Sequence, residues 1–213
     1  MPEGRRREIA DLARVHGLTI IEDDIHALLP EQRPRPVAAF APERTYYITS
    51  TSKTLAPGLR VGYVLAPPGA ADRLAAGIRA TTWAVCPSMA ELVSTWIRDG
   101  TADGLVRQHR REASARQAIA RTVLADADYE AHPNGYHLWL KLPEPWRSET
   151  FAAEARRRGV KVTPSEAFVV GRGSAPDAVR VCLGSAPSRA ELERGLHLVA
   201  QGLRSSPTDG FPV

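Results

Sequence analysis

Lysine is scarce in this sequence, and one lysine stands where an amine could do chemistry. Of 28 basic residues, the lysines are Lys53, Lys141 and Lys161. An amine can attack a carbonyl and form a Schiff base, whereas a guanidinium stays protonated and cannot. Lys53 follows a run of strand formers at residues 45–49 and three small hydroxyl residues at 50–52. Lys141 and Lys161 lie in strand-like patterns and are expected to be surface lysines.

The residues around Lys53 have the composition of a phosphate pocket. Ser50 and Ser52 offer hydroxyl and backbone N–H groups just past the expected strand, and Arg60 follows a Pro57-Gly58 turn that can bring it back to the same place. Small hydroxyls combined with one arginine bind phosphate. The simpler alternative is a polar turn that carries a solvated lysine.

A carboxylate is expected in the same cleft. Residues 18–21 form a short apolar run that ends in Glu22, Asp23 and Asp24. The carboxyl ends of neighbouring parallel strands lie side by side, so Asp23 and Lys53 are expected to meet there, unless Asp23 is only a loop or cap carboxylate. These groups suit pyridoxal 5'-phosphate, because the carboxylate would keep the pyridine nitrogen protonated and the lysine would bind the ring and move the substrate's α-proton.

The motifs resemble a known family. PGLRVGY after SK, preceded by IIEDD, is similar to the fold-type I, class I/II aminotransferases. The likeness is strongest to the branch shared by 2-aminoadipate transaminases and the aminotransferase-like domains of MocR-type GntR regulators. The resemblance implies that Lys53 is the Schiff-base lysine and Asp23 the pyridine-nitrogen partner. It also implies that Ser50, Ser52 and Arg60 bind the phosphate.

The resemblance continues downstream and implies a substrate-binding residue. HPNGYHLWLKLP at 132–143 is similar to the family's Gly-Gly-x-His-Leu-Trp strand, and GVKVTPSEAF at 159–168 to its GVxVxPGxxF segment. VRVCLGSAP at 179–187 is similar to the strand that carries the arginine for the substrate carboxylate. This match assigns the carboxylate clamp to Arg180, which would otherwise be taken for a surface arginine at a strand end.

Some positions depart from the family pattern. His26 stands where relatives usually carry a tyrosine that donates to the cofactor's phenolic oxygen, a bond that imidazole can also donate. Tyr136 and Ser165 each replace a glycine, so a narrower substrate pocket is expected. The resemblance spans residues 2–203 but begins just after the family's Asn-Pro-x-Gly segment, which predicts a fragment whose sheet has an uncovered apolar edge.

The pattern of elements predicts an α/β fold. The expected large domain, residues 1–100, is the C-terminal part of a PLP-transferase large domain, a mostly parallel sheet with helices. A small α+β domain at 101–204 and a tail at 205–213 follow, with the boundary near Gly100 and Gly104. Expected helices are 2–16, 71–82, 88–99, 104–125, 148–158 and 188–203; expected strands are 18–21, 45–49, 60–65, 136–142, 160–162 and 178–183.

Composition limits the possible partners. The chain has 213 residues, is 43% hydrophobic and carries a net charge of +4. Its arginine triplets at 5–7 and 156–158 lie in expected helices, so they predict solvated faces and no direct contact with nucleic acid. Cys86 and Cys182 lack metal spacing and predict reduced thiols. The sequence predicts neither a metal site nor a membrane span. It predicts a cytoplasmic location.

Three functions stay open at this level. The first is an aminotransferase that passes an amino group between an amino acid and a 2-oxo acid, here as an incomplete fragment. The second is an effector-sensing aminotransferase-like domain of a transcriptional regulator. The third is an inactive remnant. The resemblance also implies a homodimer in the full-length form.

Overall fold

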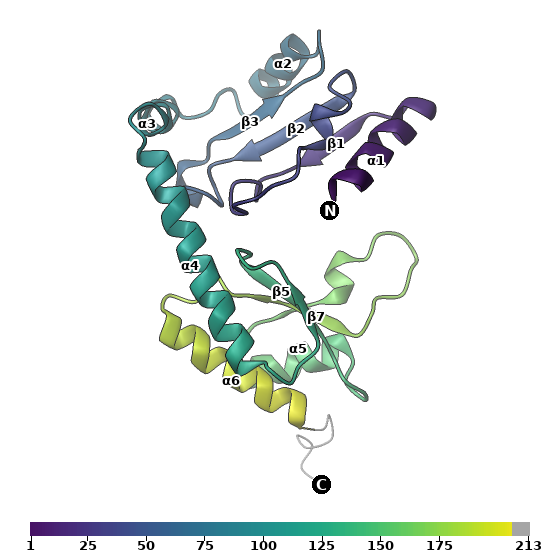
Figure 1. Ribbon diagram of the computed structural model, residues 1–213, viewed down its shortest axis with the longest axis vertical. Helices are drawn as coiled ribbons and strands as arrows, with labels where there is room; N and C mark the ends of the chain where they lie inside the picture. The colour runs from purple at the N-terminus through teal and green to yellow at the C-terminus, as the bar shows by residue number, and fades with distance from the viewer. Residues whose placement is uncertain (206–213) are drawn as a thin grey trace. The chain divides into compact units, whose positions relative to one another are not determined.

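The structure is a computed structural model that describes residues 1–205 (Figure 1). The chain divides into two compact units, residues 1–110 and 111–213. The predicted boundary at 100–104 coincides with the beginning of helix α4 (Thr101–Val123), whereas the two units divide inside that helix. The predicted tail at 205–213 lies outside the described residues except for its first residue. Within residues 1–205, no helix is long and apolar enough to cross a membrane.

The first unit contains a three-stranded sheet in the order β1-β2-β3 (Figure 1). Strands β1 (Ile20–Asp23) and β2 (Thr45–Ser50) are parallel, with Ile20 opposite Thr45 and Asp23 opposite Ile48. The predicted parallel neighbours are therefore confirmed. Strand β3 (Gly62–Leu65) is antiparallel to β2, because the loop that joins the two strands is too short for a crossover.

Helix α1 (Glu3–Val15) covers one face of this sheet. Its Ile9 and Ala10 pack with Ile20 of β1 and with Val37. The helix ends at Val15, and Gly17, just beyond its end as predicted, has a φ of +63°, the left-handed conformation that glycine adopts without strain.

A polar contact fixes the same helix. Glu22 of β1 accepts a bond from Arg6 at 3.0 Å and the backbone N–H groups of Val37 and Ala38 at 2.9 Å. Val37 and Ala38 belong to the 3-10 turn η1 (Val37–Ala39), so one carboxylate ties α1 and this turn to the sheet.

Two further helices follow β3, close to their predicted positions. These are α2 (Ala71–Thr81) and α3 (Pro87–Arg98). Pro87 begins α3, at a position where its missing N–H costs no hydrogen bond.

The second unit is an α+β domain, as predicted. Its four-stranded antiparallel sheet has the order β4-β5-β7-β6. The strands are β4 (Tyr129–Ala131), β5 (His137–Lys141), β6 (Thr163–Pro164) and β7 (Ala178–Cys182). The helices are α5 (Ser148–Arg157), α6 (Arg189–Arg204) and the C-terminal part of α4.

Two details of this sheet differ from the prediction. The apolar run 160–162 is not a strand: pairing starts at Thr163, opposite Arg180, and Val162 is buried in the core instead. Strand β4 was not predicted, because a three-residue segment is too short to show an alternating pattern.

The sheet of the second unit has two chemically different faces. Leu138 and Leu140 of β5 and Val179 and Val181 of β7 are buried in a core that includes Phe151 of α5 and residues of α6. Because side chains alternate along a strand, the residues between them lie on the opposite face. That second face carries His137 and Trp139 from β5 and Arg180 and Cys182 from β7.

Candidate functional site

Asp23 is the last residue of β1 and lies on the sheet face opposite helix α1. Glu22 contacts the helix, and alternation therefore turns Asp23 the other way, where it is exposed. Its partner in register is Ile48, two residues before Ser50, so Asp23 and Ser50 lie on the same face of the sheet at the carboxyl ends of two adjacent strands. This is the edge at which α/β sheets bind ligands.

The adjacent carboxylate, Asp24, has a different environment. The hydroxyl of Tyr47 donates to Asp24 at 3.2 Å, whereas Asp23 accepts the backbone N–H of Ile25 at 3.3 Å. Burial and the negative charge of Asp24 raise the pKa of Tyr47, so this hydroxyl stays protonated and keeps donating. The motif resemblance points to Asp23 alone, and the structure gives Asp24 a structural partner and leaves Asp23 on the exposed face.

Lys53 lies in a single helical turn that directly follows β2. The N–H of Leu55 donates to the carbonyl of Thr51 at 2.8 Å, and the Thr54 hydroxyl donates to the carbonyl of Ser50 at 3.4 Å. Thr51, Thr54 and Leu55 are buried while Lys53 is exposed. The turn therefore has a fixed inner side and presents the lysine on its outer side.

The loop after Lys53 returns Arg60 to the same end of β2. Ser50 pairs with Gly62, and the N–H of Thr51 donates to the carbonyl of Val61 at 3.1 Å. Pairing ends here, because Ser52 lies in the helical turn of Lys53 and Arg60 directly follows the 3-10 turn η2 (Pro57–Leu59). Arg60 has φ 54°, a left-handed conformation that costs a non-glycine residue roughly 1–2 kcal/mol. Strain of this kind persists where the surrounding structure fixes the backbone.

Residues that the sequence did not point to hold this loop in place. Leu55, Leu59 and Val61 are buried with Val93 of α3. His109, in the part of α4 that belongs to the first unit, places its Nε2 atom 2.9 Å from the carbonyl oxygen of Leu55. No local sequence pattern connects His109 with a loop 54 residues earlier in the chain.

His26 lies in the turn that follows β1, where it is half-buried. Its carbonyl accepts the N–H of Leu29 at 3.0 Å, which closes the turn just beyond Asp23. The structure thus places His26 three residues past Asp23 at the same end of β1.

Arg180 belongs to the second unit and is a residue of β7 rather than a strand-end surface arginine. Its guanidinium carbon lies 4.9 Å from the centre of the Phe168 ring, and Trp139, its partner in register, packs edge-on against the same ring at 5.6 Å. The Nε atom is buried without a hydrogen-bond partner among the described residues. A buried donor without a partner, on an arginine held against an aromatic ring, is a group suited to bind a carboxylate.

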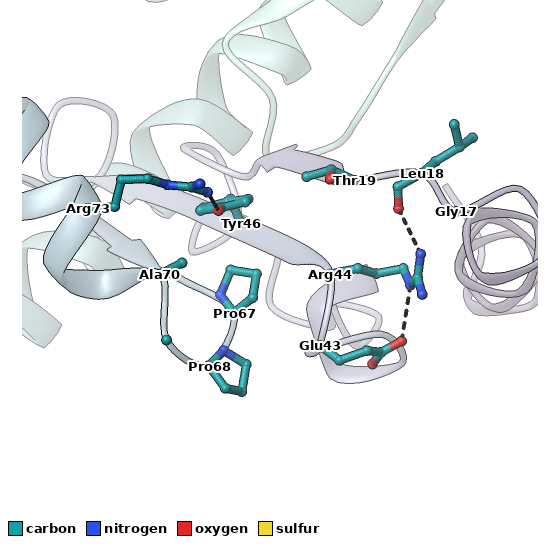
Figure 2. Close-up of a pocket in the computed structure, with 11 residues that line it drawn as sticks. Gly17, Leu18, Thr19, Glu43, Arg44, Tyr46, Pro67, Pro68, Ala70 and Arg73 are labelled. Carbon is teal, nitrogen blue, oxygen red and sulfur yellow. Dashed lines mark hydrogen bonds and ion pairs between the residues drawn. The ribbon is translucent and has the colours of Figure 1, made fainter.

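A cavity of about 430 Å³ lies at the other end of the first sheet (Figure 2). Residues just before β1 and β2 line it, together with Tyr46 of β2, the segment 67–70 after β3 and Arg73 of α2. In it Arg73 donates to the Tyr46 hydroxyl at 3.1 Å, and Arg44 donates to the carbonyl of Leu18 and to Glu43 (Figure 2). Because the strands begin here, this cavity is separate from the edge that carries Asp23 and Lys53.

The residues that commonly bind metals are dispersed. Over residues 1–205, no group of three or more His, Cys, Asp or Glu side chains is placed to hold a metal ion. Cys86 and Cys182 are free thiols.

Comparison with known proteins identifies the family. Residues 2–199 match the model of the aminotransferase class I and II family. The chain is 32% identical over 194 residues to the HTH-type transcriptional regulator YdeF of Bacillus subtilis, covering 91% of this chain and 42% of that protein. It is 27% identical over 182 residues to the 2-aminoadipate transaminase of Thermus thermophilus, covering 81% of this chain and 46% of that enzyme.

Solved structures share the fold. The α-aminoadipate aminotransferase LysN of Thermus thermophilus, in complex with N-(5'-phosphopyridoxyl)-L-leucine, superimposes with a TM-score of 0.81 at 22% identity, covering 95% of this chain and 54% of that chain. The multiple substrate aminotransferase of Thermococcus profundus gives a TM-score of 0.85 at 21% identity and covers 52% of that chain. The chain spans about half the length of the proteins it matches. With its motifs, its parallel strand pair and a family match along nearly its whole length, this chain belongs to the aminotransferase class I and II family.

Proposed function

We propose that the chain carries the lysine half of a PLP-dependent aminotransferase site. Lys53 would bind the cofactor covalently, Asp23 would hold its pyridine nitrogen, and Ser50, Ser52 and Arg60 would bind its phosphate. The observation that carries the proposal is the register of β1, β2 and β3. Asp23 and Ser50 lie at one end and on one face of the sheet, and the bond between Thr51 and Val61 returns Arg60 to that same end of β2.

The residues at this edge match the chemical groups of PLP. A carboxylate, a primary amine, two hydroxyls and a guanidinium complement a pyridinium, an aldehyde and a phosphate. PLP, when bound, supplies an electron sink that stabilises negative charge on the substrate's α-carbon. Around it, Lys53 would accept and return the α-proton, and His26 would donate toward the ring oxygen.

The proposed substrates are an amino acid and a 2-oxo acid, which share a carboxylate. Arg180 would bind that carboxylate, since its buried Nε has no protein partner in the described part of the chain and Phe168 holds its guanidinium in place. We further propose a homodimer in the full-length form and a cytoplasmic location, both supported by family membership.

Borohydride reduction of the chain mixed with PLP tests the assignment directly. Reduction fixes the cofactor on the lysine that bound it, and peptide mass mapping can separate the three lysines of this chain. The label is expected on Lys53 and is expected to disappear in Lys53→Ala. The Lys141→Ala variant is the matched control, because Lys141 is exposed and paired with Asp128 and Glu130. Equal labelling of Lys53 and Lys141 in the native chain would contradict the proposal.

A second candidate function is effector sensing in a transcriptional regulator. The observation in its favour is the similarity to HTH-type regulators, of which YdeF is 32% identical over 91% of this chain. The same site would then bind PLP and an amino compound without repeated turnover. Incubation with amino acids and a 2-oxo acid separates the two functions. Continued formation of new 2-oxo acid supports the enzyme, and a change in the cofactor's absorption without turnover supports the sensor.

A further inference from the structure

Cys182 and His137 face each other across two strands of the second unit. They are partners in the antiparallel register of β5 and β7. The N–H of Leu183 donates to the carbonyl of Tyr136 at 2.7 Å, so the pair Tyr136–Leu183 is hydrogen-bonded and the next pair, His137–Cys182, is not. Side chains of such non-hydrogen-bonded pairs approach most closely, with Cα atoms about 4.5 Å apart.

The surroundings of the sulfur favour its thiolate form. The imidazole of His137 hydrogen-bonds to the Cys182 thiol, and Ser185 and the backbone of Gly184 contribute as well. These contacts outweigh burial and lower the pKa of Cys182 from 9.0 to about 7. The residues of β6 that pair with β7 are Thr163 and Pro164, neither of which titrates. Arg180, two positions earlier on the same face, adds a positive charge on the thiol's own strand.

We propose that Cys182 and His137 form a reactive thiol–imidazole pair in which the Cys182 thiolate is oxidised by hydroperoxides. The thiolate attacks the O–O bond of the hydroperoxide, so that an S–O bond forms and the O–O bond breaks. Sulfur loses two electrons and becomes a sulfenic acid, while the hydroperoxide is reduced to an alcohol or to water. His137 gives its proton to the leaving oxygen, which balances the step.

The position of the pair gives the oxidation a consequence. Cys182 lies two residues from Arg180 on the same face of the sheet, so oxidation adds polar oxygen next to the proposed carboxylate clamp. That consequence rests on the proposed function, whereas the oxidation itself does not.

Alkylation rates test the pair without using any enzyme activity. Iodoacetamide is added to the native chain across a range of pH, and each cysteine is followed by peptide mass mapping. The rate at Cys182 is expected to rise through an inflection near pH 7. An inflection above pH 8 would overturn the proposal.

The His137→Gln variant provides the second arm, and Cys86 is the internal control. In this variant the pKa of the Cys182 thiol should return to its ordinary value, which lowers the thiolate fraction at pH 7 from about one half to about one hundredth. A thiolate of higher pKa is also a stronger nucleophile, which offsets part of this loss. The alkylation rate at Cys182 should therefore fall by about fivefold to tenfold. Cys86 is exposed and interacts with Ser88, so its rate should not change. An unchanged rate at Cys182, or an equal loss at both cysteines, would overturn the proposal.

Peroxide chemistry is tested with hydrogen peroxide and dimedone, which traps sulfenic acids. The adduct is expected on Cys182 in preference to Cys86 and should be absent in Cys182→Ser. Preferential labelling of Cys86 would overturn the proposed oxidation.

Discussion

Thr51 donates its backbone N–H to the carbonyl of Val61 at 3.1 Å, one step beyond the last paired residues of strands β2 and β3. This bond returns the chain, directly after Arg60, to the end of β2 from which the loop of Lys53 begins. Arg60 reaches this position only with a positive φ of 54°.

The strain at Arg60 allows stability and ligand binding to be separated. Arg60→Gly removes both the guanidinium and the steric cost of the left-handed backbone, so the free energy of unfolding should rise or stay level, by up to about 1 kcal/mol. Affinity for PLP should fall, because the phosphate loses a charged partner. Arg60→Ala is the control that keeps the strain. Chemical denaturation and PLP titration of both variants measure the two effects, and equal PLP affinity in all three chains would refute the phosphate role.

His109 is expected to position the Lys53 loop rather than to contact any ligand. His109→Ala removes the bond to the Leu55 carbonyl and leaves that partly buried acceptor without its partner, a cost of about 1–3 kcal/mol. Amide hydrogen exchange should become faster across residues 51–61. Exchange in that loop identical to the native chain would show that the apolar contacts of Leu55 and Leu59 are sufficient.

Glu22 connects helix α1, turn η1 and the sheet, and its loss should be costly. The side chains of Arg6 and Glu22 are 14% and 10% exposed, and removing one partner of such a part-buried pair costs up to about 3 kcal/mol. Glu22→Gln should therefore destabilise the first unit strongly. Arg5 and Glu8 form an exposed pair on the same helix, so Glu8→Gln is the matched control and should change stability by less than about 1 kcal/mol. Urea denaturation compares the free energies of unfolding of the two variants. A similar loss of stability in both would contradict the structural role given to Glu22.

Glu112 should make the second unit sensitive to acid. Hydrogen bonds from Arg189 and Arg116 lower the pKa of Glu112 from 4.5 to about 2. Because the folded pKa lies below the unfolded one, this contribution is complete above pH 4.5 and is lost as the pH falls toward 2. Glu112→Gln should weaken the native chain near neutral pH and flatten this part of the stability profile. Acid titration of both chains, monitored by circular dichroism, measures this loss of stability. Native and Glu112→Gln chains that lose stability in parallel as the pH falls would contradict the role given to Glu112.

The sheet of the first unit exposes apolar side chains that should promote association. Ile21 is 71% exposed, Val64 47% and Leu65 64%, and the whole of β3 is exposed. An open apolar edge of this kind pairs readily with other chains. The isolated chain should therefore self-associate, and Val64→Lys should reduce this association in sedimentation velocity. A native chain that sediments as a monomer and unfolds in one sharp transition would contradict this expectation.

The sequence alone determined the types and order of most elements. The periodicity of residues 2–16 and of 188–203 predicted α1 and α6 nearly to their ends, because an amphipathic pattern with a capping glycine or serine is local information. Motif similarity also identified the family. Short segments lacked this information, and β4 and the true start of β6 were therefore not found.

Tertiary structure decided what distant residues do together. Asp23 and Asp24 are adjacent carboxylates, and their environments differ because strand alternation exposes Asp23 while Tyr47 from the neighbouring strand reaches Asp24. His109 and the pair His137–Cys182 acquire their roles from a helix docking and a strand register that join residues far apart in the chain. Such pairings depend on the packing of whole elements, so no window of sequence contains them.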